Sequence, residues 1–248
     1  MRYFDLHCDT ISECFRKDVN LKSNSLQVDI QRANIFTTYI QCYAVWIPDS
    51  IRGEDAFKYF CNVADKFSEE VQSNPDMLLH CKAPGDLYRT ELLSRYGGIL
   101  TVENATALGG KIENISELSK RGVKLVSLTW NGENELGRGV RALGKTGLTD
   151  FGRKVVQELE HNGIIIDVSH ASPELIEEVA QLATRPIVAS HSNSRAVCDN
   201  PRNITDSQFG IIRDSGGLVG LNFLKYFLSD KPERSEEHTS ELQSQSNL

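Results

Sequence analysis

The 248-residue sequence lacks long hydrophobic runs, an excess of basic residues and closely spaced cysteines. No apolar stretch approaches the roughly 20 residues that cross a membrane, and no basic segment with an apolar core opens the chain, so the sequence predicts no membrane anchor. The formal net charge of −7 argues against a nucleic-acid partner, which needs a basic surface. The six cysteines form no CxxC pair, which indicates reduced thiols in a cytoplasmic protein.

A glycine-rich dinucleotide-binding turn of the form GxGxxG is also missing, although strand-like and helical patterns alternate along the chain. The apolar, β-branched runs are predicted as strands, and they occupy residues 3–9, 36–46, 97–103, 123–130, 163–170, 186–192 and 217–223. Two of these runs, 163–170 and 186–192, stay apolar until their ends, which is typical of parallel strands buried on both faces. The alternation favours an α/β fold, a TIM-type (β/α)8 barrel. A closed barrel has eight strands, so we expect an incomplete barrel with the eighth strand missing.

Several predicted helices carry their own start signals. Ser172 and Pro173 are placed as N-cap and first helical residue, and Thr205 with Gln208 has the pattern of a capping box. The long segment 47–90 is predicted to contain one helix, over residues 53–73, and a loop.

Histidines and carboxylates collect where the predicted strands end. His7 and Asp9 lie two residues apart on a strand, so their side chains point to the same face. Three more such residues follow other strands at their carboxyl ends: Glu103, His170 and His191. In parallel barrels these ends form the active-site face. Each residue alone could cap a helix or accept a buried hydrogen bond, but five ligand-type side chains on one rim indicate a metal site.

The mixture of imidazole and carboxylate suits Zn²⁺ and related ions better than Mg²⁺ or Ca²⁺, which prefer oxygen ligands. Five ligands exceed one tetrahedral site with an open position. They fit two ions that share a bridging carboxylate, with a metal-bound hydroxide as the nucleophile. Glu103 stands between the other ligands in chain order and is the natural bridge.

The motifs FDLHCDT, VE after GGIL, IIIDVSH, IVASHSNSRAVCDNPRN and GGLVGLNF resemble the membrane (renal) dipeptidase family, the peptidase M19 group of metal-dependent, amidohydrolase-like barrels. The resemblance covers the chain from its start to about residue 230. It implies a zinc-dependent metallodipeptidase with two Zn²⁺ and a dipeptide substrate, often with a D-residue on the C-terminal side. It also implies two ligand sets: His7, Asp9 and Glu103 for one zinc, and Glu103, His170 and His191 for the other.

Two further residues gain a role from this resemblance. Arg202 matches the family arginine that binds the substrate carboxylate, for which a guanidinium fork is well suited; a surface cation is the plain alternative. In animal members the fourth strand ends in LTH, whereas LTWN here places Trp130 at the histidine position, as in bacterial branches of the family. Trp130 is therefore a candidate substrate contact that cannot ionise, and packing in the wall of the site is its alternative.

The end of the chain departs from the family. Residues 234–244, RSEEHTSELQS, resemble the conceptual translation of a common sequencing adapter, so we expect a truncated barrel domain over 1–233 and a non-native, disordered tail over 234–248. The family continues to an eighth strand that ends in an aspartate, its proposed proton shuttle, and that section is absent here. We therefore expect a poor enzyme, because general acid–base assistance is worth about 10²–10⁴-fold.

Two alternative functions stay open. Another binuclear amidohydrolase usually begins with HxH and often carries a carbamylated lysine, and the motif HCD with Glu103 points away from it. The other alternative is an inactive metal-binding fragment, because of the missing strand. The resemblance also allows a homodimer.

Overall fold

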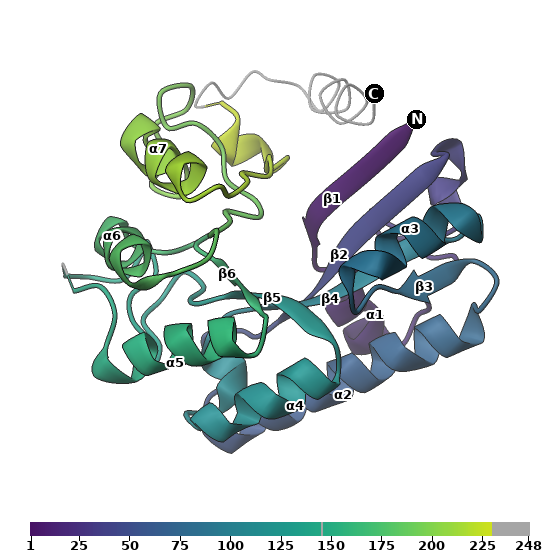
Figure 1. Ribbon diagram of the computed structural model, residues 1–248, viewed down its shortest axis with the longest axis horizontal. Helices are drawn as coiled ribbons and strands as arrows, with labels where there is room; N and C mark the ends of the chain where they lie inside the picture. Colours follow the sequence, from purple (N-terminus) through teal and green to yellow (C-terminus); the bar gives the residue numbers. More distant parts are fainter. Residues whose placement is uncertain (145, 230–248) are drawn as a thin grey trace.

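Six parallel strands form one curled sheet in the computed structural model, which describes residues 1–144 and 146–229 (Figure 1). The strands are β1 (Arg2–Cys8), β2 (Thr38–Trp46), β3 (Leu78–His80), β4 (Tyr96–Glu103), β5 (Val123–Ser127) and β6 (Ile165–Asp167). Their order is β1-β2-β4-β5-β6, and β3 pairs with the first residues of β4. The predicted parallel α/β architecture is confirmed in the form of a curled half-barrel.

The prediction of full strands over 186–192 and 217–223 is wrong. These segments form only isolated parallel bridges, Asp167 with Val188 and Ala189 with Val219. The bridges continue the strand order past β6, and the pairing stays local: the Gly220 amide donates to the Ala189 carbonyl oxygen over 2.8 Å. A Cβ at Gly217 would lie 1.7 Å from the carbonyl oxygen of Ile187, so only glycine fits there. Conversely, β3 lies in the segment predicted as a loop, because three residues are too few to show a period of two.

Helices flank the sheet, and α2, α4, α5 and α6 run along its outer side (Figure 1). The helices are α1 (Thr10–Lys17), α2 (Gly53–Ser73), α3 (Pro84–Leu92), α4 (Ile115–Lys120), α5 (Asp150–His161), α6 (Pro173–Leu182) and α7 (Asp206–Asp214), with short 3-10 turns η1 (Arg32–Ile35), η2 (Ala105–Leu108), η3 (Ile112–Asn114) and η4 (Lys225–Phe227). The predicted start signals are confirmed. The Ser172 side chain accepts from the Leu175 amide, and Thr205 with Gln208 forms a capping box.

The hydrophobic core lies between the sheet and these helices. Its largest fully buried side chains include Tyr43 and Leu100 from the sheet and Phe60, Phe67 and Leu118 from the helices. Burial of side chains of this size stabilises the fold by about 1.5–3 kcal/mol each. The packed core therefore fixes the positions at which the strands end.

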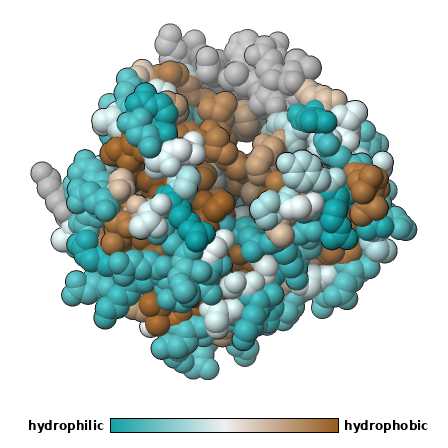
Figure 2. Space-filling view, viewed as in Figure 1, coloured by the Kyte–Doolittle hydropathy of each residue, from teal (hydrophilic) through white to brown (hydrophobic). Residues whose placement is uncertain are grey.

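The two edges of the half-barrel, β1 on one side and residues 217–223 on the other, face each other across a cavity of about 380 Å³, which we call the seam. It is lined by residues 3–6, Ser190, residues 218–221 and Phe223. A Cβ at Gly220 would lie 3.1 Å from Leu6 Cδ1, so the edges touch there, yet no ladder joins them within the described residues. Phe4, Leu218 and Leu221 are exposed, and Figure 2 shows hydrophobic side chains gathered around this hollow. The open seam is consistent with the predicted incomplete barrel.

The predicted domain boundary at residue 233 and the tail over 234–248 lie outside the described residues. None of the helices in the described part of the chain is both long enough and apolar enough to cross a membrane.

Candidate metal centre

The structure brings together the five candidate ligands at the carboxyl ends of the strands. His7 is the second-last residue of β1, and Asp9 follows that strand as the N-cap residue of α1. Glu103 is the last residue of β4, His170 follows β6, and His191 follows the Asp167–Val188 bridge. The ligands therefore come from β1 at one edge of the sheet, from β4 in its middle, and from β6 and the segment after it at the other edge.

Glu103 is the centre of the cluster, and its side chain is only 4% exposed. Its Oε1 lies 2.8 Å from His170 Nε2 and 3.5 Å from His191 Nε2, and its Oε2 lies 3.6 Å from His7 Nε2. Asp9 lies at the rim, with 49% of its side chain exposed and its Oδ1 3.4 Å from His7 Nε2. Glu103 thus faces all three imidazoles, and the ligand atoms of His7, Glu103 and His191 lie within 4.8 Å of one another, with the rings of His7 and His191 stacked at 3.7 Å.

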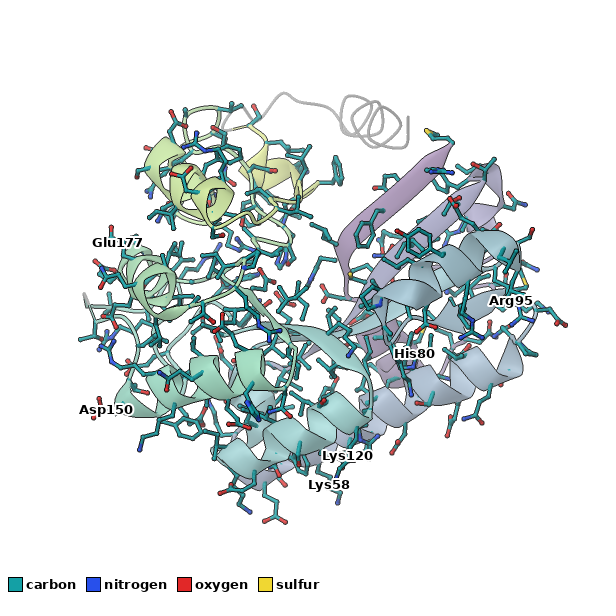
Figure 3. All side chains as sticks on the ribbon, in the orientation of Figure 1. Lys58, His80, Arg95, Lys120, Asp150 and Glu177 are labelled. Atoms are coloured by element: carbon teal, nitrogen blue, oxygen red, sulfur yellow. The ribbon has the colours of Figure 1, made fainter. Side chains whose placement is uncertain are left out.

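The other histidines of the described chain lie away from this cluster. His80, labelled in Figure 3, is on β3 opposite Gly98, toward the amino end of β4, and packs edge-on against Phe67. His161 ends α5 on the outside of the sheet. The charged residues Lys58, Asp150 and Glu177, also labelled in Figure 3, lie on outer helices.

Hydrogen bonds behind the cluster orient two of the imidazoles. Ser190 Oγ donates to Asp167 Oδ2 over 2.5 Å, so it accepts from His191 Nδ1 over 2.7 Å. His170 Nδ1 lies 3.0 Å from Asn131 Oδ1, and an amide oxygen can only accept. Both Nδ1 atoms therefore carry hydrogen, and both Nε2 atoms turn a lone pair toward Glu103.

The electrostatics separate the three histidines. Burial, with a further contribution from Arg202, lowers the pKa of His170 to about 4. Burial, His7 and Arg202 hold the pKa of His191 well below its usual range. For His7 burial also acts to lower the pKa, but Glu103 and Asp9 outweigh it and raise the pKa to about 9. At neutral pH the imidazoles of His170 and His191 are neutral, and that of His7 is the protonated, positively charged one of the three.

The donor set fits divalent metal ions. The Nε2 atoms of His170 and His191 lie 3.0 Å apart, and with both Nδ1 atoms protonated no hydrogen lies between them. Two lone pairs and a carboxylate that face each other in a buried place repel unless a cation lies among them. Neutral imidazole and carboxylate are among the ligands that hold zinc in proteins.

Arg202 is buried behind this cluster, with 3% of its surface exposed. It donates to Ser192 Oγ over 3.1 Å and to the His191 carbonyl oxygen over 3.0 Å, whereas its Nε has no hydrogen-bond partner among the described residues. Burial lowers the pKa of Arg202 only to about 10, so the guanidinium remains charged. A buried cation with an unused N–H is suited to receive an anion.

Trp130 forms part of the wall of the site. Its ring lies 6.2 Å from that of His170 and packs edge-on against Trp46 at 5.2 Å. Sequence reasoning missed Asn131 and Asp167, which stand behind His170 and His191. Asp167 lies inside the motif IIIDVSH, and a carboxylate at the end of an apolar run was the signal that could have found it.

A sequence model of the membrane dipeptidase family (peptidase family M19) matches residues 1–242, beyond the predicted domain boundary. An uncharacterized protein in the pqqA 5′ region of Klebsiella pneumoniae is 34% identical over 154 residues, which cover 60% of this chain and 57% of that protein. Dipeptidase 3 of Mus musculus is 28% identical over 210 residues, which cover 82% of this chain and 42% of that protein. The chain spans about half the length of the curated relatives it matches.

Solved structures share the fold. A metallopeptidase from Rhodobacter sphaeroides, bound to a phosphinate mimic of the dipeptide L-Ala-D-Ala, matches with a TM-score of 0.86 and 23% identity over 99% of this chain and 82% of that one. A structure described as dipeptidase AC, a metallopeptidase of family M19, matches with a TM-score of 0.86 and 25% identity over 99% of this chain and 80% of that one.

Proposed function

The chain belongs to the membrane dipeptidase family, peptidase family M19, and on that premise we propose that it is a zinc-dependent dipeptidase. The observation that carries the proposal is the convergence of three imidazoles on the buried carboxylate of Glu103. The neutral imidazoles of His170 and His191 turn two lone pairs toward this buried carboxylate, and a metal ion would stabilise that arrangement.

Two ions share the site in this proposal. His7, Asp9 and Glu103 hold one, and Glu103, His170 and His191 hold the other. When bound, the metal supplies Lewis-acid chemistry, which activates water and polarises the carbonyl of the peptide bond. The protein's own part is to keep His170 and His191 neutral, to hold Glu103 ionised and to keep the cluster buried. Ionised Glu103 agrees with its pKa, which burial acts to raise but His7 and the other histidines hold well below its usual range.

Arg202 is proposed to bind the free carboxylate of the dipeptide. Its Nε–H is unused among the described residues, and its Nη2 contacts the backbone of His191, so an anion there would lie beside the metal ligands. The Rhodobacter relative binds a mimic of L-Ala-D-Ala, and we propose a dipeptide of this kind as the substrate here. Trp130 contributes a wall beside His170.

Metal dependence is tested with Glu103→Gln. We expect this variant to lose bound zinc and to lose more hydrolysis of L-Ala-D-Ala than the roughly 10–100-fold that follows loss of an outer hydrogen-bond partner. Metal content by mass spectrometry and kcat/KM are the measurements. Glu70→Gln is the matched control, because Glu70 is equally buried but pairs with Lys66 away from the site. Equal zinc content in both variants would contradict the assignment.

Substrate recognition is tested with Arg202→Ala. Loss of a charged hydrogen bond should weaken kcat/KM for a dipeptide with a free carboxylate by roughly 1.5–3 kcal/mol, and an amidated dipeptide should be unaffected. Arg195→Ala is the control, because Arg195 pairs with Asp199 on the same segment. Equal losses on both substrates would refute the role of Arg202.

A second candidate, metal binding without turnover, is favoured by the open seam, which reaches Ser190, the residue before the proposed ligand His191. Full zinc content in the unmodified protein with no hydrolysis of any dipeptide would support it over the dipeptidase. We do not propose the alternative of another binuclear amidohydrolase, because the dipeptidase family model matches nearly the whole chain.

A further inference from the structure

Asp167 is a fully buried carboxylate that is not among the proposed ligands. It is the last residue of β6 and has no exposed surface. Its Oδ1 accepts from the backbone amides of Ser169 and Ser190, both over 2.9 Å. Its Oδ2 accepts from the hydroxyls of Ser127 and Ser190, both over 2.5 Å. Four donors around one carboxylate hold it ionised and immobile.

We propose that Asp167 and Ser190 are positioning residues that fix His191 in the tautomer which presents Nε2 to the metal centre. This inference rests on the proposed metal centre. Ser190 has one hydroxyl hydrogen, which it donates in a hydrogen bond to Asp167. A lone pair of Ser190 Oγ therefore faces His191 Nδ1 at 2.7 Å. His191 must then carry its hydrogen on Nδ1, and Nε2 keeps its lone pair.

The chain of hydrogen bonds also acts on the strength of the ligand. A carboxylate behind a hydroxyl polarises it, and the hydroxyl then accepts more strongly from the imidazole, which makes Nε2 a better donor to a metal. A second bond, from the His191 amide to Ser169 Oγ over 3.1 Å, holds the backbone of the ligand in place. Loss of such a partner typically weakens metal binding by about 10–100-fold.

Ser127 provides a matched control within the chain. Its hydroxyl donates to the same Oδ2 of Asp167 at the same 2.5 Å as that of Ser190, and it is equally buried. The hydrogen bonds that join Ser190 to His191 do not include Ser127. Ser127→Ala therefore removes the same kind of bond to the same carboxylate and leaves the acceptor of His191 Nδ1 intact.

The test is zinc affinity, measured by competition with a chromophoric chelator, and zinc stoichiometry, in the unmodified protein and in Ser190→Ala, Ser127→Ala and Asp167→Asn. We expect Ser190→Ala and Asp167→Asn to lower the affinity for one of the two proposed zinc ions by about 10–100-fold. Ser127→Ala should lower that affinity by less than about 3-fold. Ser190→Thr, which keeps a hydroxyl, should restore affinity relative to Ser190→Ala. Equal effects of Ser190→Ala and Ser127→Ala, or no effect of Ser190→Ala, would overturn the inference.

A second measurement does not depend on the folding of any variant. The nitrogen chemical shifts of the His191 ring in the metal-free protein report its tautomer, and we expect hydrogen on Nδ1 at neutral pH. Hydrogen on Nε2 would overturn this inference and leave the proposed function intact. An unmodified protein that binds no zinc would overturn the proposed function and this inference together.

Discussion

Glu103 has a different kind of partner on each of its two carboxylate oxygens. Its Oε1 faces His170 and His191, which burial keeps neutral, whereas its Oε2 faces His7, which carries a proton. The metal-free cluster thus keeps part of its charge balance with a single proton on His7. A metal must displace that proton, because a protonated imidazole has no lone pair for it.

The proton on His7 makes the stability of the metal-free protein depend on pH. The pKa of His7 is raised from 6.5 to about 9 in the folded state, so its contribution is complete below about pH 6.5 and is lost as the pH rises through about 9. The loss amounts to at most about 3.5 kcal/mol, at about 1.4 kcal/mol per pKa unit. Urea unfolding in the presence of a chelator, at several pH values between 6.5 and 9.5, measures it.

His7→Gln is the control for this pH dependence, because it keeps a polar side chain that does not titrate in this range. His170 and His191 do not contribute in the same window, because their lowered pKa values affect stability only below about pH 6.5. The same decline in His7→Gln as in the unmodified protein would show that another group is responsible.

Among the elements, the loop after β5 has the largest part in holding the site. The amide of Val140 donates to the His170 carbonyl oxygen over 2.7 Å, and Asn131 contacts the ring of His170. These contacts hold His170 in the left-handed region, at a φ of 68°, where a residue other than glycine is strained. The strain is maintained by the loop, and the ring of His170 is thereby directed at Glu103.

Gly139 is the close contact within this loop. A Cβ there would lie 2.0 Å from the carbonyl oxygen of Trp130, which precedes Asn131, so Gly139→Ala must displace the backbone. We expect a loss of about 1–3 kcal/mol in the free energy of unfolding, as for overpacking, and weaker zinc binding because Asn131 moves. Gly85→Ala in α3 is the control, since a Cβ there meets open space. Unchanged zinc affinity in Gly139→Ala would show that the loop does not position His170.

The sequence predicts the ligands of the candidate centre but not the residues that hold them in place. His7, Asp9, Glu103, His170 and His191 could be found because each follows an apolar run, and parallel strands end on one face. The contact between Asn131 and His170 joins residues 39 apart and depends on the path of a loop, for which the sequence has no period. The apolar composition of residues 186–192 and 217–223 predicts two full strands after β6, but only single residue pairs meet there, and composition does not report how many residues of two segments pair.

The candidate centre connects the two arms of the half-barrel, which are the strands from β1 to β4 and the segments from β6 to residue 223. β1 lies at one edge of the sheet order and β6 at the other, and Glu103 on β4 lies between them. Across the seam the same arms have little to hold them, because β1 and residues 217–223 form no ladder within the described part of the chain. Exposed strand edges and apolar side chains favour self-association. We therefore expect metal binding to contribute more to the stability of this fold than it would in a closed barrel.

Metal binding should therefore raise the thermal stability of the whole chain. At free zinc 100-fold above the dissociation constant, linkage gives about 2.7 kcal/mol, which corresponds to a rise of roughly 5–10 °C in Tm for a chain of this size. Differential scanning fluorimetry with and without zinc measures the shift. Glu103→Gln should show little of it, and an equal rise in that variant would mean that zinc acts elsewhere.

The order of the proposed ligands along the sequence has a consequence for the nascent chain on the ribosome. His7 and Asp9 are made first, and roughly 180 residues separate them from His191, which takes about 10–40 s to synthesise at 5–20 residues per second. In the proposed two-ion centre, the ligand set that contains Asp9 is complete once Glu103 has emerged, whereas the other set must wait for His191. During translation, a first metal ion can therefore be captured by an N-terminal arm that has not yet met its partner arm.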